Sequence, residues 1–150
     1  MSAGALVKHA SFAVVRAAAA LTGSQVASDE LSAENWDHVD LYVTWVPDGS
    51  SGGVEIAPEV KNLATGEWYP LTEQTAAGSP SSGVVQRTVS TLRYVVPKEI
   101  TKTVIPVPVR GAHIIRFQVK ELGSPGAPST ACALYAAVSR GSAGGSSPTQ

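Results

Sequence analysis

Residues 37–46 read DHVDLYVTWV, a stretch in which apolar and polar side chains alternate. Val39, Leu41, Val43 and Trp45 point to one face of an extended chain, and the residues between them point to the other. Strict alternation over this length is typical of a half-buried β-strand. The stretch therefore predicts a strand that turns one face toward a hydrophobic core.

The same alternation recurs along the chain. It is clear again at residues 112–121, where Ile115, Phe117 and Val119 share a face. Further strands are predicted at residues 12–21, 54–60, 66–71, 84–96, 104–109 and 130–140. About seven or eight short strands separated by turns are typical of an antiparallel β-sandwich or barrel. We predict an all-β, antiparallel β-sandwich, and a jelly roll with extended N- and C-terminal arms fits the pattern best.

Five of these strands carry more detailed expectations. The segment PDGSSGG at residues 47–53 is rich in turn formers, so residues 37–46 and 54–60 are expected to form a hairpin. The strand at 84–96 places Val85, Val89 and Val95 on one face, which arginines share, and we expect it to be imperfectly buried. Two prolines at 104–109 predict an edge strand or an extended arm. Residues 12–21 contain a run of alanines that also suits a helix, although we predict a strand.

Length and composition indicate one domain. The chain has 150 residues, of which 43% are hydrophobic and 15% are charged. We expect an N-terminal arm at residues 1–8, a sandwich at 9–140, and a Gly/Ser-rich tail at 141–150 that packs only if a partner holds it.

Several classes of protein are disfavoured. The net charge of −1 argues against direct binding of nucleic acid. No apolar stretch is long enough to span a membrane, and Arg16 interrupts the apolar run that a signal peptide would need. Because Cys132 is the only cysteine, the chain can form neither an intrachain disulfide nor a thiolate-rich zinc site.

Residues 49–53 match the G-x-S-x-G motif of serine hydrolases, with Ser51 as the nucleophile. His113 would be the base, oriented by Glu99 or Glu121. In hydrolases this motif joins a strand to a helix, but here a strand follows, so a hairpin tip is favoured. The three histidines and the scattered carboxylates do not have the spacing of metal ligands or of a glycosidase pair. We expect no catalytic residue, no metal and no cofactor.

Aromatic residues and charges indicate surfaces instead. Trp68 and Tyr69 are neighbours, so in a strand they point to opposite faces, and an exposed one would be an anchor for a sugar or a protein. Residues 1–75 carry three basic and ten acidic side chains, whereas residues 76–150 carry eight basic and two acidic ones. Part of this charge is expected to pair within the subunit. The remainder would form two opposed patches, through which copies meet around a symmetry axis. The acidic patch would contain Asp37, Asp40, Asp48, Glu55 and Glu59, and the basic patch Arg87, Arg93, Arg110, Arg116 and Lys120.

Three stretches, residues 36–45, 66–71 and 108–117, together resemble small β-sandwich virion proteins of tailed bacteriophages. The similarity is to auxiliary capsid proteins, also called cement or decoration proteins. It covers roughly residues 36–140 and lies in the alternating strands, the low-charge surface and the Gly/Ser/Pro tail rather than in a diagnostic motif. The resemblance implies a non-enzymatic role on the capsid surface, as a homotrimer bound to the major capsid protein. The alternatives are a tail or head–tail connector component and a carbohydrate-binding module. The candidate interface residues are Trp68, Tyr69, Asp40, Glu55, Arg93, Arg110 and Arg116.

Overall fold

The computed structural model describes residues 7–8, 12–47, 51–76, 83, 85–109, 111–123 and 131–139. Every regular element in these ranges is a strand, which confirms the all-β prediction. Asp48, Gly49, Arg110 and the expected C-terminal tail lie outside the described residues. The strands are β1 (Val7–Lys8), β2 (Phe12–Ala20), β3 (Val26–Ala27), β4 (Glu30–Ser32), β5 (His38–Val46), β6 (Ser51–Lys61), β7 (Trp68–Pro70), β8 (Thr72–Ala76), β9 (Arg87–Thr91), β10 (Tyr94–Val96), β11 (Lys102–Pro108), β12 (Ile114–Gly123) and β13 (Ala131–Ser139).

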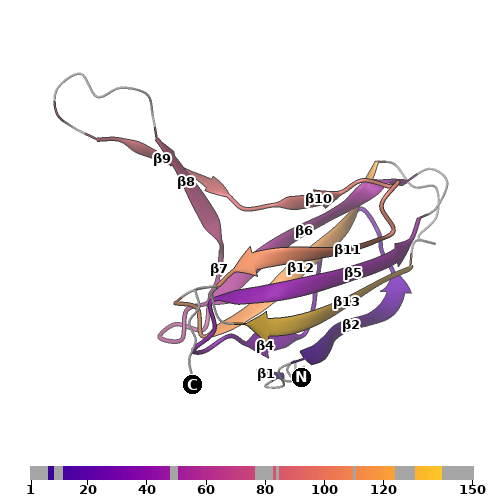
Figure 1. The fold of residues 1–150 in the computed structure, drawn as a ribbon, viewed down its shortest axis with the longest axis horizontal. Coiled ribbons are helices and arrows are strands. Elements are labelled where there is room, and N and C mark those ends of the chain that lie inside the picture. Colours follow the sequence, from indigo (N-terminus) through magenta and orange to yellow (C-terminus); the bar gives the residue numbers. More distant parts are fainter. Residues whose placement is uncertain are drawn as a thin grey trace.

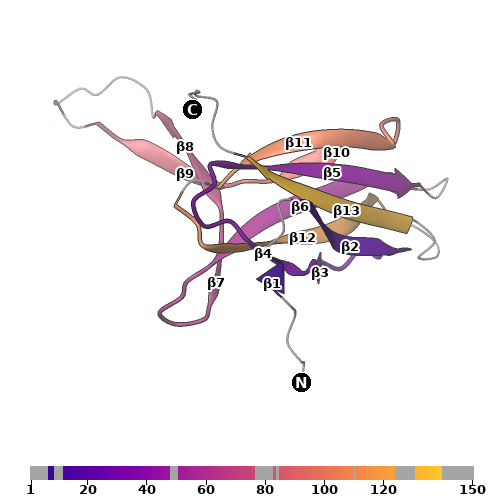
Figure 2. The ribbon, with the colours of Figure 1, turned by 60° about the horizontal axis from the view of Figure 1, so that its bottom comes forward.

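The body of the molecule is a sandwich of two sheets (Figures 1 and 2). The larger sheet has the order β1-β4-β12-β6-β10, with β3 also paired to β12 and β7 to β6. The smaller sheet has the order β11-β5-β13-β2. Strands β8 and β9 pair only with each other, and this two-stranded ribbon projects beyond one end of the sandwich (Figure 1).

The core lies between the two sheets and consists of the apolar residues that alternation predicted. Val39, Leu41, Val43 and Trp45 are at most 1% exposed, and the expected face of β12 is equally buried. The indole N–H of Trp45 donates a hydrogen bond of 2.7 Å to the carbonyl oxygen of Ile100. This bond satisfies the one polar atom that such a buried tryptophan carries.

Two other strand predictions are also confirmed. Residues 12–20 form strand β2, which pairs with β13 through two irregularities in register. Strand β11 lies at the edge of the smaller sheet, where Pro106 and Pro108 need not donate to a further strand.

The expected hairpin between residues 37–46 and 54–60 is wrong. Strand β5 belongs to the smaller sheet, between β11 and β13, whereas β6 belongs to the larger sheet, between β12 and β10. The connection therefore crosses from one sheet to the other. Both strands carry enough apolar residues to occupy the middle of a sheet, so each pairs with other strands on both sides.

The single strand expected at residues 84–96 is also wrong. It is divided into β9 and β10, and the valines expected to share a face, Val85, Val89 and Val95, are all exposed. The break follows from a backbone hydrogen bond of 2.8 Å that Leu92 N–H donates to the carbonyl oxygen of Leu71. This bond anchors the ribbon, and the chain N-terminal to it leaves the body of the sandwich to pair with β8.

Candidate protein-binding surfaces

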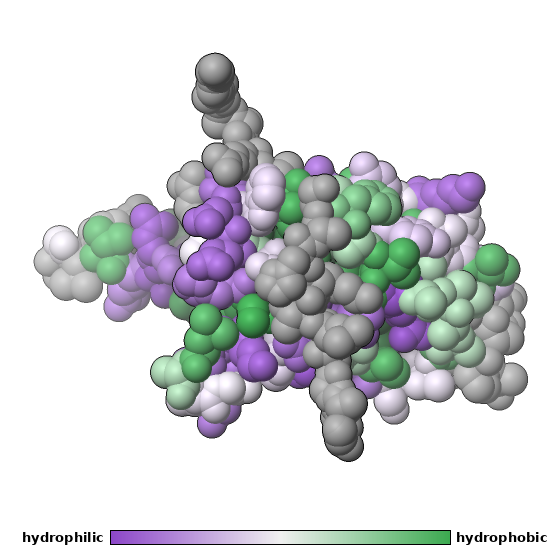
Figure 3. Space-filling model, turned by 90° about the horizontal axis from the view of Figure 1, so that it is seen from below, coloured by the Kyte–Doolittle hydropathy of each residue, from purple (hydrophilic) through white to green (hydrophobic). Residues whose placement is uncertain are grey.

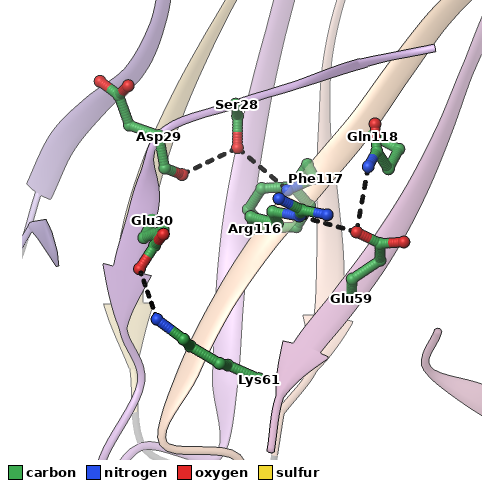
Figure 4. A network of polar contacts seen from close by, with 8 residues as sticks. All are labelled: Ser28, Asp29, Glu30, Glu59, Lys61, Arg116, Phe117 and Gln118. Carbon is green, nitrogen blue, oxygen red and sulfur yellow. Dashed lines mark hydrogen bonds and ion pairs between the residues drawn. The ribbon is translucent and has the colours of Figure 1, made fainter. Parts of the chain in front are cut away.

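The outer face of the larger sheet carries a ladder of paired charges from β6 and β12 (Figure 4). Arg116 Nε lies 2.7 Å from Glu59 Oε1, and Gln118 Nε2 donates a hydrogen bond of 3.1 Å to the same oxygen. Lys120 Nζ lies 3.8 Å from Glu55 Oε2. We call Glu55, Glu59, Arg116, Gln118 and Lys120 the charge ladder.

Trp68 on β7 extends this ladder. Its ring lies 4.2 Å from Arg116 Cζ and 5.7 Å from Lys61 Nζ, distances that suit cation–π contacts. Lys61 Nζ in turn lies 3.8 Å from Glu30 Oε1. Trp68 is half-buried by these contacts, whereas Tyr69 is the exposed member of the aromatic pair.

The ladder changes the expectation about charge patches. Glu55 is only 8% exposed, so the prediction that it lies in an exposed acidic patch is wrong. Glu59, Arg116 and Lys120 are engaged within the chain as well. Strands from the two halves of the sequence lie side by side here, and much of the charge difference between the halves is neutralised inside one subunit. Asp40 and Arg93 take part in no such pairs among the described residues.

The outer face of the smaller sheet carries two adjacent rows that are almost entirely apolar. One row crosses all four strands through the residue pairs Val104–Tyr42, Tyr42–Tyr135 and Tyr135–Val14. The next row runs through Pro106, Asp40, Ala137 and Phe12. We call these eight residues the apolar face.

Much of the apolar face is open to solvent. Phe12 is 54% exposed, and its ring lies 5.8 Å from that of Tyr42 and 6.3 Å from that of Tyr135. Figure 3 views the edge of the sandwich, where hydrophobic residues gather on the body away from the ribbon and hydrophilic residues near the ribbon's base. Soluble monomers rarely expose contiguous apolar patches larger than roughly a few hundred Å², and larger patches usually mark a site that binds another protein or a ligand.

Asp40 is the only charged residue of the apolar face. It is half-buried between Pro106 and Ala137, and its side chain forms no ion pair or hydrogen bond with another described residue. A carboxylate in apolar surroundings gains most from a cationic partner, because the local dielectric is low.

The ribbon of β8 and β9 is a second open surface. Its five residue pairs run from Thr72–Thr91 to Ala76–Arg87, and every one of the ten residues is exposed. Arg87 and Val89 lie two residues apart and therefore point to the same side of the ribbon. An isolated two-stranded hairpin is marginally stable in water, so a ribbon of this kind gains order from a contact.

A hollow of about 290 Å³ lies at one end of the sandwich. It is lined by Glu34, Asn35, Trp36, Asp37, Gly111, Ala112 and His113. His113 Nδ1 lies 3.7 Å from Glu34 Oε2 in this hollow. The lining combines an aromatic ring with carboxylate and amide groups, which is the chemistry that binds sugar hydroxyls.

The structure does not assemble the serine-hydrolase arrangement. Ser51 pairs with Gly123 at the end of β12, whereas His113 precedes the start of the same strand. The ten residues of β12 separate the two side chains by roughly 30 Å. Ser51 is buried, and its hydroxyl oxygen accepts a hydrogen bond of 3.2 Å from Gly53 N–H.

Cys132 is buried in the core, where desolvation raises the pKa of its thiol to about 11 and Arg16 opposes the shift. A thiol in this state is a poor nucleophile at neutral pH. Within the described part of the chain, no three His, Cys, Asp or Glu side chains gather as a metal site would need. The described residues also contain no helix that is long and apolar enough to cross a membrane.

No protein-family model, curated protein or solved structure matches this chain. The two open surfaces therefore carry the functional argument. Sequence reasoning recognised neither as a surface, although it named Asp40 of the apolar face and Arg87 of the ribbon as members of the two charge patches. A signal for that face was present in residues 12–15, Phe-Ala-Val-Val, because a strand that is apolar on both sides exposes apolar residues unless both sides are covered.

Proposed function

We propose that this chain is a non-enzymatic structural protein of a virion, a cement protein that binds the outside of a tailed phage's major capsid shell and stabilises it. The observation that carries the proposal is the apolar face. An aromatic and aliphatic surface that crosses all four strands of a sheet suits a broad protein–protein contact, including one between copies of this chain assembled on a shell, better than a small-molecule site.

The path of the chain supports this proposal. Strands β2, β5, β11 and β13 lie in the smaller sheet, and β4, β6, β10 and β12 in the larger one, so along these eight strands the chain changes sheet at every step except from β6 to β10. We infer that this winding is a jelly roll, an architecture common in viral capsid proteins and lectins. A fold alone does not determine a function, so the functional argument depends on the exposed surfaces.

A structural role in a virion also includes that of a tail or head–tail connector component, which would share these features and differ only in its partner. We favour the capsid because the sequence resembles cement proteins, and three copies is the number that this resemblance implies. The chain's own residues require no cofactor for such a role.

Binding to shells tests the proposal. Purified protein is added to capsid shells assembled without it, and binding is measured by co-sedimentation, with tail preparations as the comparison. We expect saturable binding to shells and a higher temperature at which the shells open. Binding to tails alone, or to neither, would overturn the capsid assignment.

A second candidate function, carbohydrate binding, is favoured by the hollow that contains Trp36, Glu34 and His113. A glycan array tests it. Binding that is lost in Trp36→Ala would support a sugar site in this hollow. An array without signal would leave the structural role as the remaining candidate.

A further inference from the structure

We propose that copies of this chain bind each other by laying the ribbon of one copy across the apolar face of the next, with Arg87 against Asp40 and Val89 against Tyr42. The inference rests on the proposed assembly role, but it does not depend on which shell the protein binds.

Neither surface has a partner among the residues that the structure describes. The ribbon projects away from the sandwich (Figures 1 and 2), and its ten residues are exposed. The apolar face is bare over Phe12, Val14, Tyr42 and Val104. A contact between them would order the ribbon and remove apolar surface from water at the same time.

Complementary charge and apolar character point to a second copy as the occupant. Arg87 and Val89 are separated by one residue on β9 and point to the same side, and Asp40 and Tyr42 have the same relation on β5. Each pair spans about 7 Å along its strand. One docking position therefore places the guanidinium against the carboxylate and the valine against the tyrosine ring.

The ionic partners are both available. Neither Asp40 nor Arg87 forms an ion pair with another described residue. Asp40 is already half-buried among apolar neighbours, so a bound arginine would interact with it under weak solvent screening. On the larger sheet, the charges of the ladder and of the Glu30–Lys61 pair are already engaged within the subunit.

The symmetry of this contact determines which kinds of assembly it can form. Ribbon and apolar face are different surfaces, so the contact is heterologous, and copies joined in this way form a closed ring or an open chain. A ring uses every ribbon and every face, and three copies would match the number that the cement-protein resemblance implies.

Charge reversal tests the contact. Sedimentation velocity is measured for the wild type, Arg87→Glu, Asp40→Arg and the double variant, and urea midpoints verify folding. We expect each single reversal to weaken self-association at least about a hundredfold, because like charges then meet, and the double variant to recover it. Glu73→Lys, on the opposite side of the ribbon, is the matched control and should associate as the wild type does.

A second variant guards against misfolding at Asp40. Val89→Asp should abolish association, whereas Val95→Asp, an equally exposed valine on β10, should not. A monomeric wild type, single reversals that associate normally, or a double variant that does not recover would overturn the proposal. If these variants fail to alter association while the wild type still binds shells, the ribbon contact is wrong and the capsid role stands. If charge reversal behaves as expected but shells are not bound, the ribbon contact stands and the capsid role is wrong.

Discussion

Replacing Arg116 with alanine should destabilise the fold and leave self-association intact. The guanidinium sits between two partners, Glu59 Oε1 at 2.7 Å and the Trp68 ring at 4.2 Å. The side chains of Arg116 and Glu59 are only 24% and 19% exposed, so water replaces these contacts incompletely when arginine is removed. Arg116 was a candidate interface residue, and the variant separates a role inside the subunit from one between subunits.

The magnitude follows from the contacts. A hydrogen bond between charged groups contributes about 1.5–3 kcal/mol, and a partly exposed cation–π contact about 0.5–1 kcal/mol. Because both groups keep some exposure, we expect Arg116→Ala to lower the free energy of unfolding by about 2–3 kcal/mol. Arg116→Lys keeps the charge but not the planar stacking, and should cost about 1 kcal/mol.

Urea denaturation measures these effects. The midpoint for Arg116→Ala should fall by roughly 1 M with an unchanged slope. Arg93→Ala removes an exposed arginine that lies outside the ladder, and should stay within about 0.5 kcal/mol of the wild type. A double-mutant cycle with Glu59→Gln isolates the pair. An Arg116→Ala midpoint equal to that of Arg93→Ala would refute the reasoning, and so would a loss of self-association without a loss of stability.

Two further predictions concern the core. Gly53→Ala should lower the free energy of unfolding by more than about 2 kcal/mol, because Gly53 has φ of +126° and a Cβ there would lie 2.7 Å from the Val96 carbonyl oxygen. Gly23→Ala is the control and should have little effect, because the space around Gly23 is open. Equal urea midpoints for the two variants would contradict this reasoning. Burial raises the thiol pKa of Cys132 from 9.0 to about 11, so the folded thiol should react with Ellman's reagent at pH 8 at least about a hundredfold more slowly than the unfolded one. Since the unfolded thiol loses its proton first, stability should also fall as the pH rises from 9.0 to about 11, and less so in Cys132→Ala. A thiol that reacts equally fast in both states would contradict its burial.

The sequence predicted the faces of strands better than their partners. Alternation at residues 37–46 and 112–121 identified the buried side chains correctly, because one side of each strand packs on the core. It could not show that β5 and β6 lie in different sheets, since turn-forming residues reverse the chain whether or not the strands pair. Pairing depends on contacts between residues far apart in the sequence.

The candidate surfaces were harder to predict for a related reason. Residues 87–91 are exposed on both sides, so their burial has no period for a sequence pattern to reveal. Tyr42 falls on the polar side of its strand's alternation, and its contact with Phe12 joins segments thirty residues apart. The two halves of the chain do differ in charge, but most of the charged residues on β6 and β12 lie opposite each other across one sheet.

The proposed capsid role is tested most directly by electron cryomicroscopy of the particles from which this chain is isolated. We expect density for the two-sheet sandwich on the outside of the capsid shell, with each ribbon lying over the β11-β5-β13-β2 sheet of a neighbouring copy. Sandwich density confined to the tail, or a complete capsid shell with no such density, would contradict it.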